Sequence, residues 1–595
     1  WPLRGGMRSR FALMLIAGSA LACAAETNPA LTRSAADYVP ALAPLTRPSA
    51  SAARELVERF ASDRAELDRL HAVKGSAQHR RRMGDFLATW RARLEQIDAT
   101  MLEVEGAIDV ALLRTRVVHE QRLLEREMAR QAEVAPWLPF ADALIALPEA
   151  RRNLEPVDGR AVAEALESVR KGVEPLRTSL EEKLKAGQGP SKVVALRAAG
   201  RLTELQRALT EWFDTYNGYD PEFGWWARDP YKQVTQALEA YGKVLREKAA
   251  GIDPKQRDEP IIGDPIGRAG LMDELAKELV AYSPEELIAL AEREFTWVDR
   301  ELRRAAGDMG LGDDWKAALE RVKRDHVAPG QQPALVRDLA LEAERYVRER
   351  DLVTVPPLAA DVWLLKMMPP AQQKVAPFFL GGSDILVAFP TDEMTHEEKV
   401  QSLRANNRHF ARATVFHELV PGHHLQFWAK QRHNPHRELF TTPFWMEGWA
   451  LWWELRLWDL GFFNTPEGRM GTLFWRAHRC ARIIFSLKFH LGEWTPQQCV
   501  DFLVDRVGHE RASATGEVRR SFNGQWSPLY QAGYLLGALQ IRTLHREFVA
   551  SGKLGEKAFH DAILNGGPMP IEMVRARLSG AKPSVDYRPA WRFAD

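Results

Sequence analysis

Apolar residues recur at helical spacing along most of this chain, and this periodicity constrains its fold more than any other feature. Within 51–250, Leu113, Val117, Leu124 and Met128 fall on one face of a helix, with Arg and Glu between them. Such a stripe is typical of core packing. These four residues are therefore predicted to be buried, and 51–250 is predicted to be an N-terminal helical region.

The rest of the chain is also mainly helical in pattern. The segment 251–267 carries Pro and Gly and is the best internal boundary. Beyond it, SPEE from Ser283 and TPQQ from Thr495 predict capped helix starts with Pro at the first helical position. One strand is predicted at 385–389, after two glycines. The predicted fold is mainly α with a small β element.

The composition excludes several classes of protein. A hydrophobic fraction of 45% is ordinary for a folded protein, and 595 residues allow one large or several ordinary domains. The 81 basic residues nearly balance the 80 acidic ones, which argues against a nucleic-acid binder. Three cysteines are too few for a disulfide framework or a Cys-rich zinc module.

The N-terminus has the pattern of an export signal. In residues 1–22, Arg8 and Arg10 precede a short apolar run and an Ala-Leu-Ala cleavage site. Cys23 follows directly, so both simple secretion and lipid attachment at this cysteine fit the pattern. Residues 23–50, rich in Ala, Pro, Ser and Thr, are predicted to be a tether. We expect an exported protein, either periplasmic or an envelope lipoprotein whose membrane attachment is through Cys23.

The main chemical signal is the segment HELVPGHH, which begins at His417. A zinc hydrolase needs neutral imidazoles on the metal and a nearby carboxylate that takes a proton from the metal-bound water. The usual H-E-x-x-H spacing is absent, because Pro421 stands where the second His would be. On a straight helix His423 and His424 would lie roughly 9 and 10.5 Å from His417. The helix must therefore bend if two of them bind one ion.

Pro421 and Gly422 can supply this bend. Proline has no N–H for the carbonyl of His417, and glycine permits unusual backbone angles. His423 is the preferred second ligand, because it needs the smaller insertion and follows the glycine, and His424 is the alternative. The competing interpretation is that the three histidines are structural residues at a helix kink.

A third ligand is expected on the next helix. Thr442 and Pro443 predict its start. Glu447 is its first acid, on a face lined by aromatic residues, where a carboxylate is costly unless it is paired or bound to a cation. Glu447 is thus the predicted third ligand, with a buried ion pair as the alternative. Glu454 is expected either to orient a histidine ligand from behind or to form a salt bridge with an arginine.

These residues resemble the motifs of the bacterial domain-of-unknown-function 885 family, which is grouped with the zincin-like metallopeptidases. The matching segments are HELVPGHHLQ, MEGWALWWE, RAHRCARIIFSLKFHLGEWTPQQ, EVRR and YQAGYLLG, within roughly residues 410–540. They place Arg482, His490 and Tyr534 on the Arg, His and Tyr of the family pattern.

Three positions depart from that pattern. Ser486 stands where the family usually has Asp, Lys488 where it has Gly, and Trp452 where it has Tyr. Loss of the acid puts a supporting role around His490 in doubt. The proposed metal ligands and Glu418 all match the pattern.

The resemblance implies a large multi-helix zincin-like fold with the active site in a cleft, within a catalytic region at 268–595. It implies that His417, His423 and Glu447 hold Zn²⁺. Glu418 is expected to be the general base that activates the attacking water.

Other roles follow from the same resemblance. Tyr534, or else His490, is expected to donate a hydrogen bond to the oxyanion, and the alternative for Tyr534 is a packed aromatic residue. Arg482, Arg519 and Arg520 are candidates for holding the terminal carboxylate of a peptide, with structural ion pairs as the alternative.

The expected function is therefore that of an exported zinc peptidase acting on short peptides. A metal-dependent amidase or esterase acting on a small non-peptide substrate is one alternative. A non-catalytic exported binding protein is the other.

Overall fold

The computed structural model describes residues 50–71, 73–253, 259–356, 359–360, 363–373, 378, 381–382 and 384–594. The predicted export signal, Cys23 and the tether up to residue 49 lie outside the described residues. These residues are mainly helical and include one two-stranded sheet, which confirms the predicted mainly α fold with a small β element. None of the described helices is both long enough and apolar enough to span a membrane.

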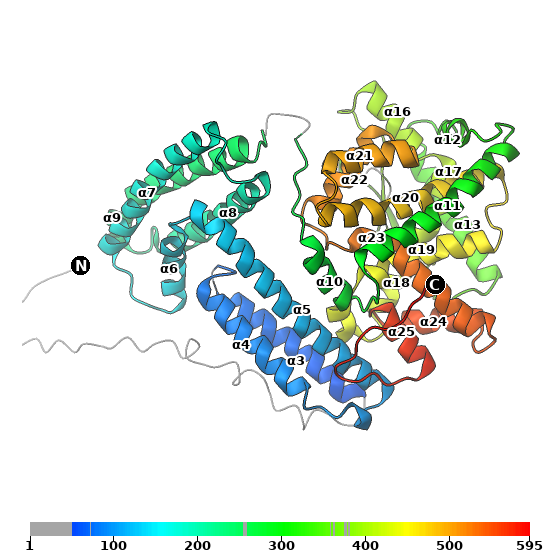
Figure 1. Ribbon diagram of the computed structural model, residues 1–595, viewed down its shortest axis with the longest axis horizontal. Helices are drawn as coiled ribbons and strands as arrows, with labels where there is room; N and C mark the ends of the chain where they lie inside the picture. Colours follow the sequence, from blue (N-terminus) through cyan, green and yellow to red (C-terminus); the bar gives the residue numbers. More distant parts are fainter. Residues whose placement is uncertain are drawn as a thin grey trace, which may run out of the picture.

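The first part of the chain is an array of helices. They are α3 (Ala50–Arg69), α4 (Ala77–Leu94), η2 (Ala99–Met101), α5 (Val104–Val134), η3 (Ala135–Trp137), α6 (Ala141–Arg152), α7 (Gly159–Lys185), α8 (Lys192–Tyr216), α9 (Pro221–Lys243) and η4 (Val244–Ala249). Helices α6 to α9 and η4 enclose a core of their own, whereas α3, α4 and the first half of α5 share the core of the C-terminal helices. Figure 1 shows α7, α8 and α9 together at one side of the molecule, with α5 leading from them towards the C-terminal helices.

Because the helices form two separate cores, only part of the predicted stripe on α5 is buried. Leu113 and Val117 are fully buried in the shared core, as expected. Leu124 is only partly buried and Met128 is half exposed, so the prediction is wrong for the second half of the stripe. The reason is that α5 leaves one core after Val117 and enters the other only at Val134.

The second part of the chain carries the candidate site. Its helices are α10 (Gly267–Lys277), α11 (Pro284–Asp308), α12 (Trp315–Lys323), α13 (Gln332–Glu349), α15 (Pro370–Gln373), α16 (His396–Ala405), α17 (Arg408–Glu418), α18 (His423–Lys430), η5 (Pro435–Phe440), α19 (Pro443–Asp459), α20 (Pro466–His490), α21 (Pro496–Phe502), η6 (Leu503–Val507), α22 (Arg511–Phe522), α23 (Tyr530–His545), η7 (Arg546–Ala550), α24 (Glu556–Gly566) and α25 (Ile571–Ser579). The capping boxes predicted at Ser283 and Thr495 are both present. Thr442 caps α19 through its side chain, as predicted.

The small β element is a parallel pair. Strand β1 (Leu364–Met367) pairs with β2 (Asp384–Val387), with Leu364 opposite Asp384. The predicted strand at 385–389 is confirmed in position but ends at Val387. Its partner β1 was not predicted.

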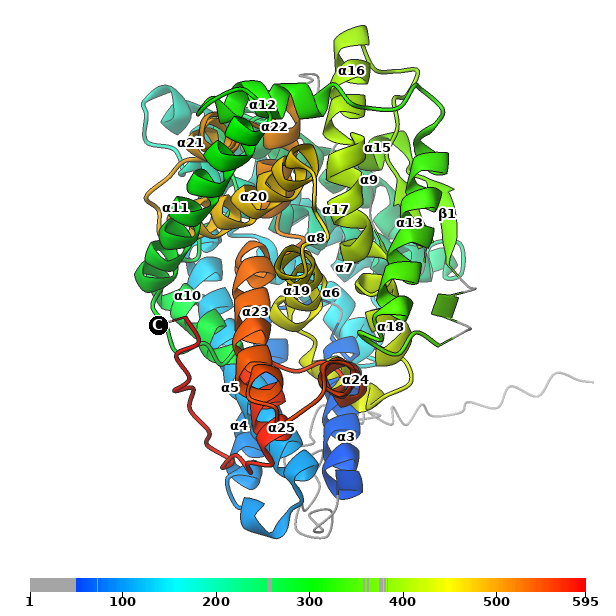
Figure 2. The same cartoon turned by 90° about the vertical axis from the view of Figure 1, so that its right-hand side faces the viewer.

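Helices α19 and α23 make the closest helix contact around the site. A Cβ atom on Gly448 of α19 would lie 2.6 Å from the Cα of Gly537 on α23, so neither position has room for a side chain. Figure 2 shows the two helices side by side near the middle of the molecule. This approach brings the acids of α19 against the tyrosines of α23.

Candidate metal centre

The helix that carries HELVPGHH is broken where the sequence predicts a bend. Helix α17 ends at Glu418 and α18 begins at His423. Leu419 (φ −112°, ψ −108°) and Gly422 (φ −75°, ψ −131°) are not helical, and the peptide bond before Pro421 is cis. The predicted bend is therefore confirmed, and it is a complete break between two helices.

Two features hold this break in place. The indole N–H of Trp449, on α19, donates a hydrogen bond to the carbonyl oxygen of Pro421 at 2.9 Å. A Cβ atom on Gly422 would overlap the backbone carbonyl of His417, so only glycine fits there. The backbone of the break is thus packed tightly against the end of α17.

The break brings His423, and not His424, to the acid of α19. The ligand atoms of His417, His423 and Glu447 all lie within 4.8 Å of one another, and all three residues are buried. Glu447 Oε2 is 3.3 Å from His417 Nε2 and 3.1 Å from His423 Nε2. The two ring nitrogens of His424 instead contact the backbone carbonyls of Gly382 and Ala359, at 3.0 and 2.7 Å.

Glu454 contacts the first histidine from behind. Its Oε1 lies 2.9 Å from His417 Nδ1 and 3.5 Å from Nη2 of Arg479, so both roles considered for this acid are present together. A ring that donates its Nδ1–H to a carboxylate keeps the lone pair of Nε2 for a metal. This contact therefore suits His417 to bind a cation through Nε2.

The charges of the cluster are consistent with a cation site. Burial alone would lower the pKa of His417, but its hydrogen bonds to Glu447 and Glu454 outweigh this effect and raise the pKa to about 9. Burial alone would raise the pKa of Glu447, but His423 and His417 hold it well below its usual value. Glu447 is therefore ionised. Two imidazole nitrogens and one carboxylate oxygen are a donor set that fits Zn²⁺.

Glu418 lies beside this set without belonging to it. It is the last residue of α17, it is only partly buried, and its negative charge acts on His417. Its carboxylate accepts a hydrogen bond from the backbone N–H of Gly381, three residues before β2. A Cβ atom on Gly381 would overlap the backbone of Glu418, so the two segments are in close contact.

Two tyrosines on α23 complete the surroundings. The hydroxyl of Tyr530 donates a hydrogen bond to Glu447 Oε1, and the ring of Tyr534 stacks on the ring of His417 at 5.9 Å. Burial raises the pKa of both hydroxyls, so both stay protonated. Tyr530 was not predicted from the sequence. Its spacing of four residues from Tyr534, which places both on one helix face, is the signal that could have found it.

Comparison with known proteins identifies the family. The family model described as "Bacterial protein of unknown function (DUF885)" matches residues 61–578. The chain belongs to the DUF885 family. The membership that the motifs suggested is thus confirmed, over far more of the chain than the motifs cover.

A solved structure shares the fold of this DUF885 chain, and a second is less similar. A candidate lipoprotein of unknown function from Shewanella oneidensis has a TM-score of 0.64 and 17% identity, covering 89% of this chain and 99% of that chain. A candidate lipoprotein from Colwellia psychrerythraea has a TM-score of 0.49 and 18% identity, covering 73% of this chain and 78% of that chain. No curated protein matches this chain.

Two of the site residues expected in the DUF885 chain lie elsewhere. His490 packs against Phe489 and Phe522, and burial lowers its pKa to about 4. His490 lies eight residues after Arg482, or roughly 12 Å further along α20, and it is not part of the cluster of His417, His423 and Glu447. Arg519 donates a hydrogen bond to the backbone carbonyl of Glu259 at 2.8 Å.

The departures from the DUF885 pattern have local partners. The indole N–H of Trp452 donates to His560 Nε2 at 2.9 Å, and the other ring nitrogen of His560 contacts the carbonyl of Leu352. The hydroxyl of Ser486 lies 3.4 Å from the carbonyl of Ile483 in its own helix. Trp452 therefore has a polar partner of its own, although it lacks a hydroxyl.

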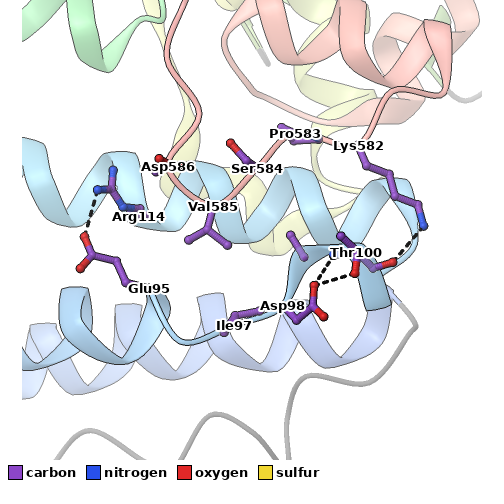
Figure 3. A pocket seen from close by; sticks show the side chains of 11 residues that line it. Glu95, Ile97, Asp98, Thr100, Arg114, Lys582, Pro583, Ser584, Val585 and Asp586 are labelled. Atoms are coloured by element: carbon purple, nitrogen blue, oxygen red, sulfur yellow. Dashed lines mark hydrogen bonds and ion pairs between the residues drawn. The ribbon is translucent and has the colours of Figure 1, made fainter.

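A pocket of about 780 Å³ lies apart from the centre of this DUF885 protein (Figure 3). It is lined by the turn between α4 and α5 and by a segment near the C-terminus, and it shares no residue with the metal cluster. Glu95 pairs with Arg114 at 2.9 Å, and Asp98 bonds to Thr100. These polar side chains already have partners, so the pocket does not require a ligand.

Proposed function

We propose that this chain is a zinc-dependent hydrolase whose centre is formed by His417, His423 and Glu447. The observation that carries this proposal is the convergence of three buried ligand atoms within 4.8 Å of one another. The contact between Glu454 and His417 Nδ1 supports it, because such carboxylates are typical partners of metal-bound histidines. Zn²⁺, when bound, supplies a Lewis acid that makes a water molecule nucleophilic at neutral pH.

The residues around the ligands have complementary tasks. The carboxylate of Glu418, oriented by the N–H of Gly381, takes a proton from the attacking water and passes it to the leaving amine. The protonated hydroxyl of Tyr534 donates to the oxyanion that develops on the substrate carbonyl. Tyr530 holds Glu447 through its hydrogen bond to Oε1.

The proposed substrate class is short peptides, on a zincin-like fold. The similarity to a Shewanella protein described as a candidate lipoprotein supports an exported location, either periplasmic or attached through a lipid on Cys23. A metal-dependent amidase or esterase would use the same residues on a small non-peptide substrate. A non-catalytic binding protein would have no need for Glu418 beside the ligands.

Metal content and hydrolysis test the proposal. The chain from residue 24 onwards, loaded with zinc, is assayed against dipeptides, acylated amino acids and peptidoglycan fragments. We expect one zinc per chain, lost in Glu447→Ala, and hydrolysis that is abolished in Glu418→Gln while its zinc remains bound. Full zinc in Glu447→Ala would remove this residue from the centre. Unchanged turnover in Glu418→Gln would remove the general base.

A further inference from the structure

Three arginines gather one aromatic ring away from the metal cluster. The guanidinium carbon of Arg482 lies 4.4 Å from the ring centre of Tyr534, and that of Arg479 lies 4.7 Å from it. The same ring stacks on His417. Arg520, on α22, lies 5.8 Å from the ring centre of Tyr530.

The three arginines face two neighbouring tyrosines. Arg482 and Arg479 face the ring of Tyr534, and Arg520 faces the ring of Tyr530, whose centre lies 5.7 Å from that of Tyr534. All three guanidinium groups therefore lie around the same pair of tyrosines, although they come from two different helices.

These arginines have fewer partners than their charge requires. Arg482 pairs with Glu517 at 2.7 Å through Nη2, but its buried Nε and Nη1 have no hydrogen-bond partner among the residues that the structure describes. Arg479 shares Glu454 with His417, and its Nε is also without a described partner. Arg520 forms no hydrogen bond or ion pair with any described residue. Its guanidinium faces the rings of Trp526 and Tyr530, and the charges of Glu517 and Glu447 act on it from further away.

A buried guanidinium N–H without an acceptor is costly, and Arg482 and Arg479 both have such groups. The ligand that best satisfies such a group is a carboxylate, because its two oxygens accept from the fork of an arginine. From the stacking distances, Arg482 is at most about 10 Å from the ring of His417, a span covered by three extended residues. A short substrate is therefore long enough to span both groups.

We infer that Arg482 and Arg520 form a subsite for a free carboxylate of the substrate, carried one or two residues beyond the bond that is hydrolysed. Arg479 contributes charge to this subsite while it supports Glu454. The inference rests on the proposed hydrolase function. It narrows the substrates to peptides, acylated ones included, that are cleaved one or two residues before a free C-terminal carboxylate. The third predicted carboxylate binder, Arg519, is not part of this subsite, and it donates a hydrogen bond to the backbone carbonyl of Glu259.

The test compares N-acetyl-trialanine with its C-terminal amide. In the zinc-loaded wild type we expect kcat/KM to favour the free acid by about 10-fold to 100-fold, the effect of charge-assisted hydrogen bonds. Arg520→Met should lower this ratio towards one, and Arg520→Lys should keep part of it. The matched control, Arg519→Met, should keep the ratio of the wild type. Arg520 is chosen because it has no ion pair, and thermal unfolding checks that each variant is folded.

A binding measurement separates this inference from the proposed function. Calorimetry with the zinc-loaded Glu418→Gln variant measures the affinity of the acid and of the amide without turnover. Tighter binding of the acid that is lost on adding Arg520→Met supports the subsite. An equal kcat/KM for the acid and the amide, or an equal affinity for both, overturns the subsite even if both compounds are hydrolysed. If neither compound is hydrolysed, this result counts against the proposed function. The binding comparison alone then decides whether the subsite exists.

Discussion

Replacing Glu454 by Gln tests whether the protein prepares His417 as a ligand. Glu454 Oε1 and His417 Nδ1 are 2.9 Å apart, and both side chains are almost fully buried. Glutamine has the same length but no charge, so the imidazole N–H loses a charge-assisted partner. Its amide group can also present N–H to the ring, which favours the tautomer that protonates Nε2.

The expected loss can be bounded from known metal sites. Removing a carboxylate behind a metal-bound histidine lowers the affinity for the metal roughly 10-fold to 100-fold. This corresponds to about 1.4–2.8 kcal/mol of binding free energy. Because Arg479 lies 3.5 Å from the same oxygen, the metal-free fold is also expected to lose some stability. Zinc affinity and stability must therefore be measured separately.

The assay is zinc competition against a chromophoric chelator, together with thermal unfolding of the metal-free protein. Glu556→Gln is the matched control, because Glu556 also contacts both a histidine and an arginine. Its Oε2 lies 2.9 Å from His545 Nε2, and its Oε1 lies 2.8 Å from Arg456 Nε. It lies outside the metal cluster, so its zinc affinity should equal that of the wild type. A folded Glu454→Gln variant that binds zinc as tightly as the wild type would refute the role assigned to this carboxylate.

Three further predictions concern packing and charge. In Gly422→Ala the new methyl group would overlap the carbonyl of His417, so we expect loss of bound zinc and a lower melting temperature; a normal zinc content would contradict this geometry. In Gly448→Ala a Cβ atom 2.6 Å from the backbone of α23 should cost about 1–3 kcal/mol of unfolding free energy, measured by denaturant titration. Burial tends to raise the pKa of Glu274, but its histidine and arginine partners on α5 outweigh this and lower the pKa from 4.5 to about 2. The stabilisation by the ionised carboxylate is therefore complete above pH 4.5 and lost as the pH falls towards 2. The free energy of unfolding of Glu274→Gln should be lower than that of the wild type by up to about 3 kcal/mol at pH 7. This difference should disappear in acid, and a difference that stays constant with pH would contradict the assignment.

The bend in the HELVPGHH segment could be predicted because its causes are local. A proline without an N–H and a glycine without a Cβ act on the turn in which they stand, whatever the rest of the chain does. The spacing then makes His423 a better candidate than His424, and the structure brings His423 to Glu447. Glu447 itself could be found because a carboxylate among aromatic residues needs a partner.

The side chains around the ligands could not be predicted in the same way. Helix α20 is buried along nearly its whole length, so its apolar pattern does not show which face meets the metal cluster. The sequence therefore selected His490 on this helix and overlooked Arg479. Arg519 and Arg520 are neighbours in sequence, but they are about 100° apart around α22, and only the packed structure distinguishes them.

Several residues of the MEGWALWWE motif on α19 have separate structural tasks around the proposed centre. Glu447 is the proposed ligand, Gly448 lets α23 approach closely enough for its tyrosines to contact the cluster, and Trp449 bonds to the carbonyl of Pro421 in the helix break. Glu454, two turns later, supports His417. One helix thus supplies an acid, space for a second helix, and a bond that holds the break between the two histidines. The proposed metal centre therefore depends on α17, α18, α19 and α23 together, and HELVPGHH alone cannot form it.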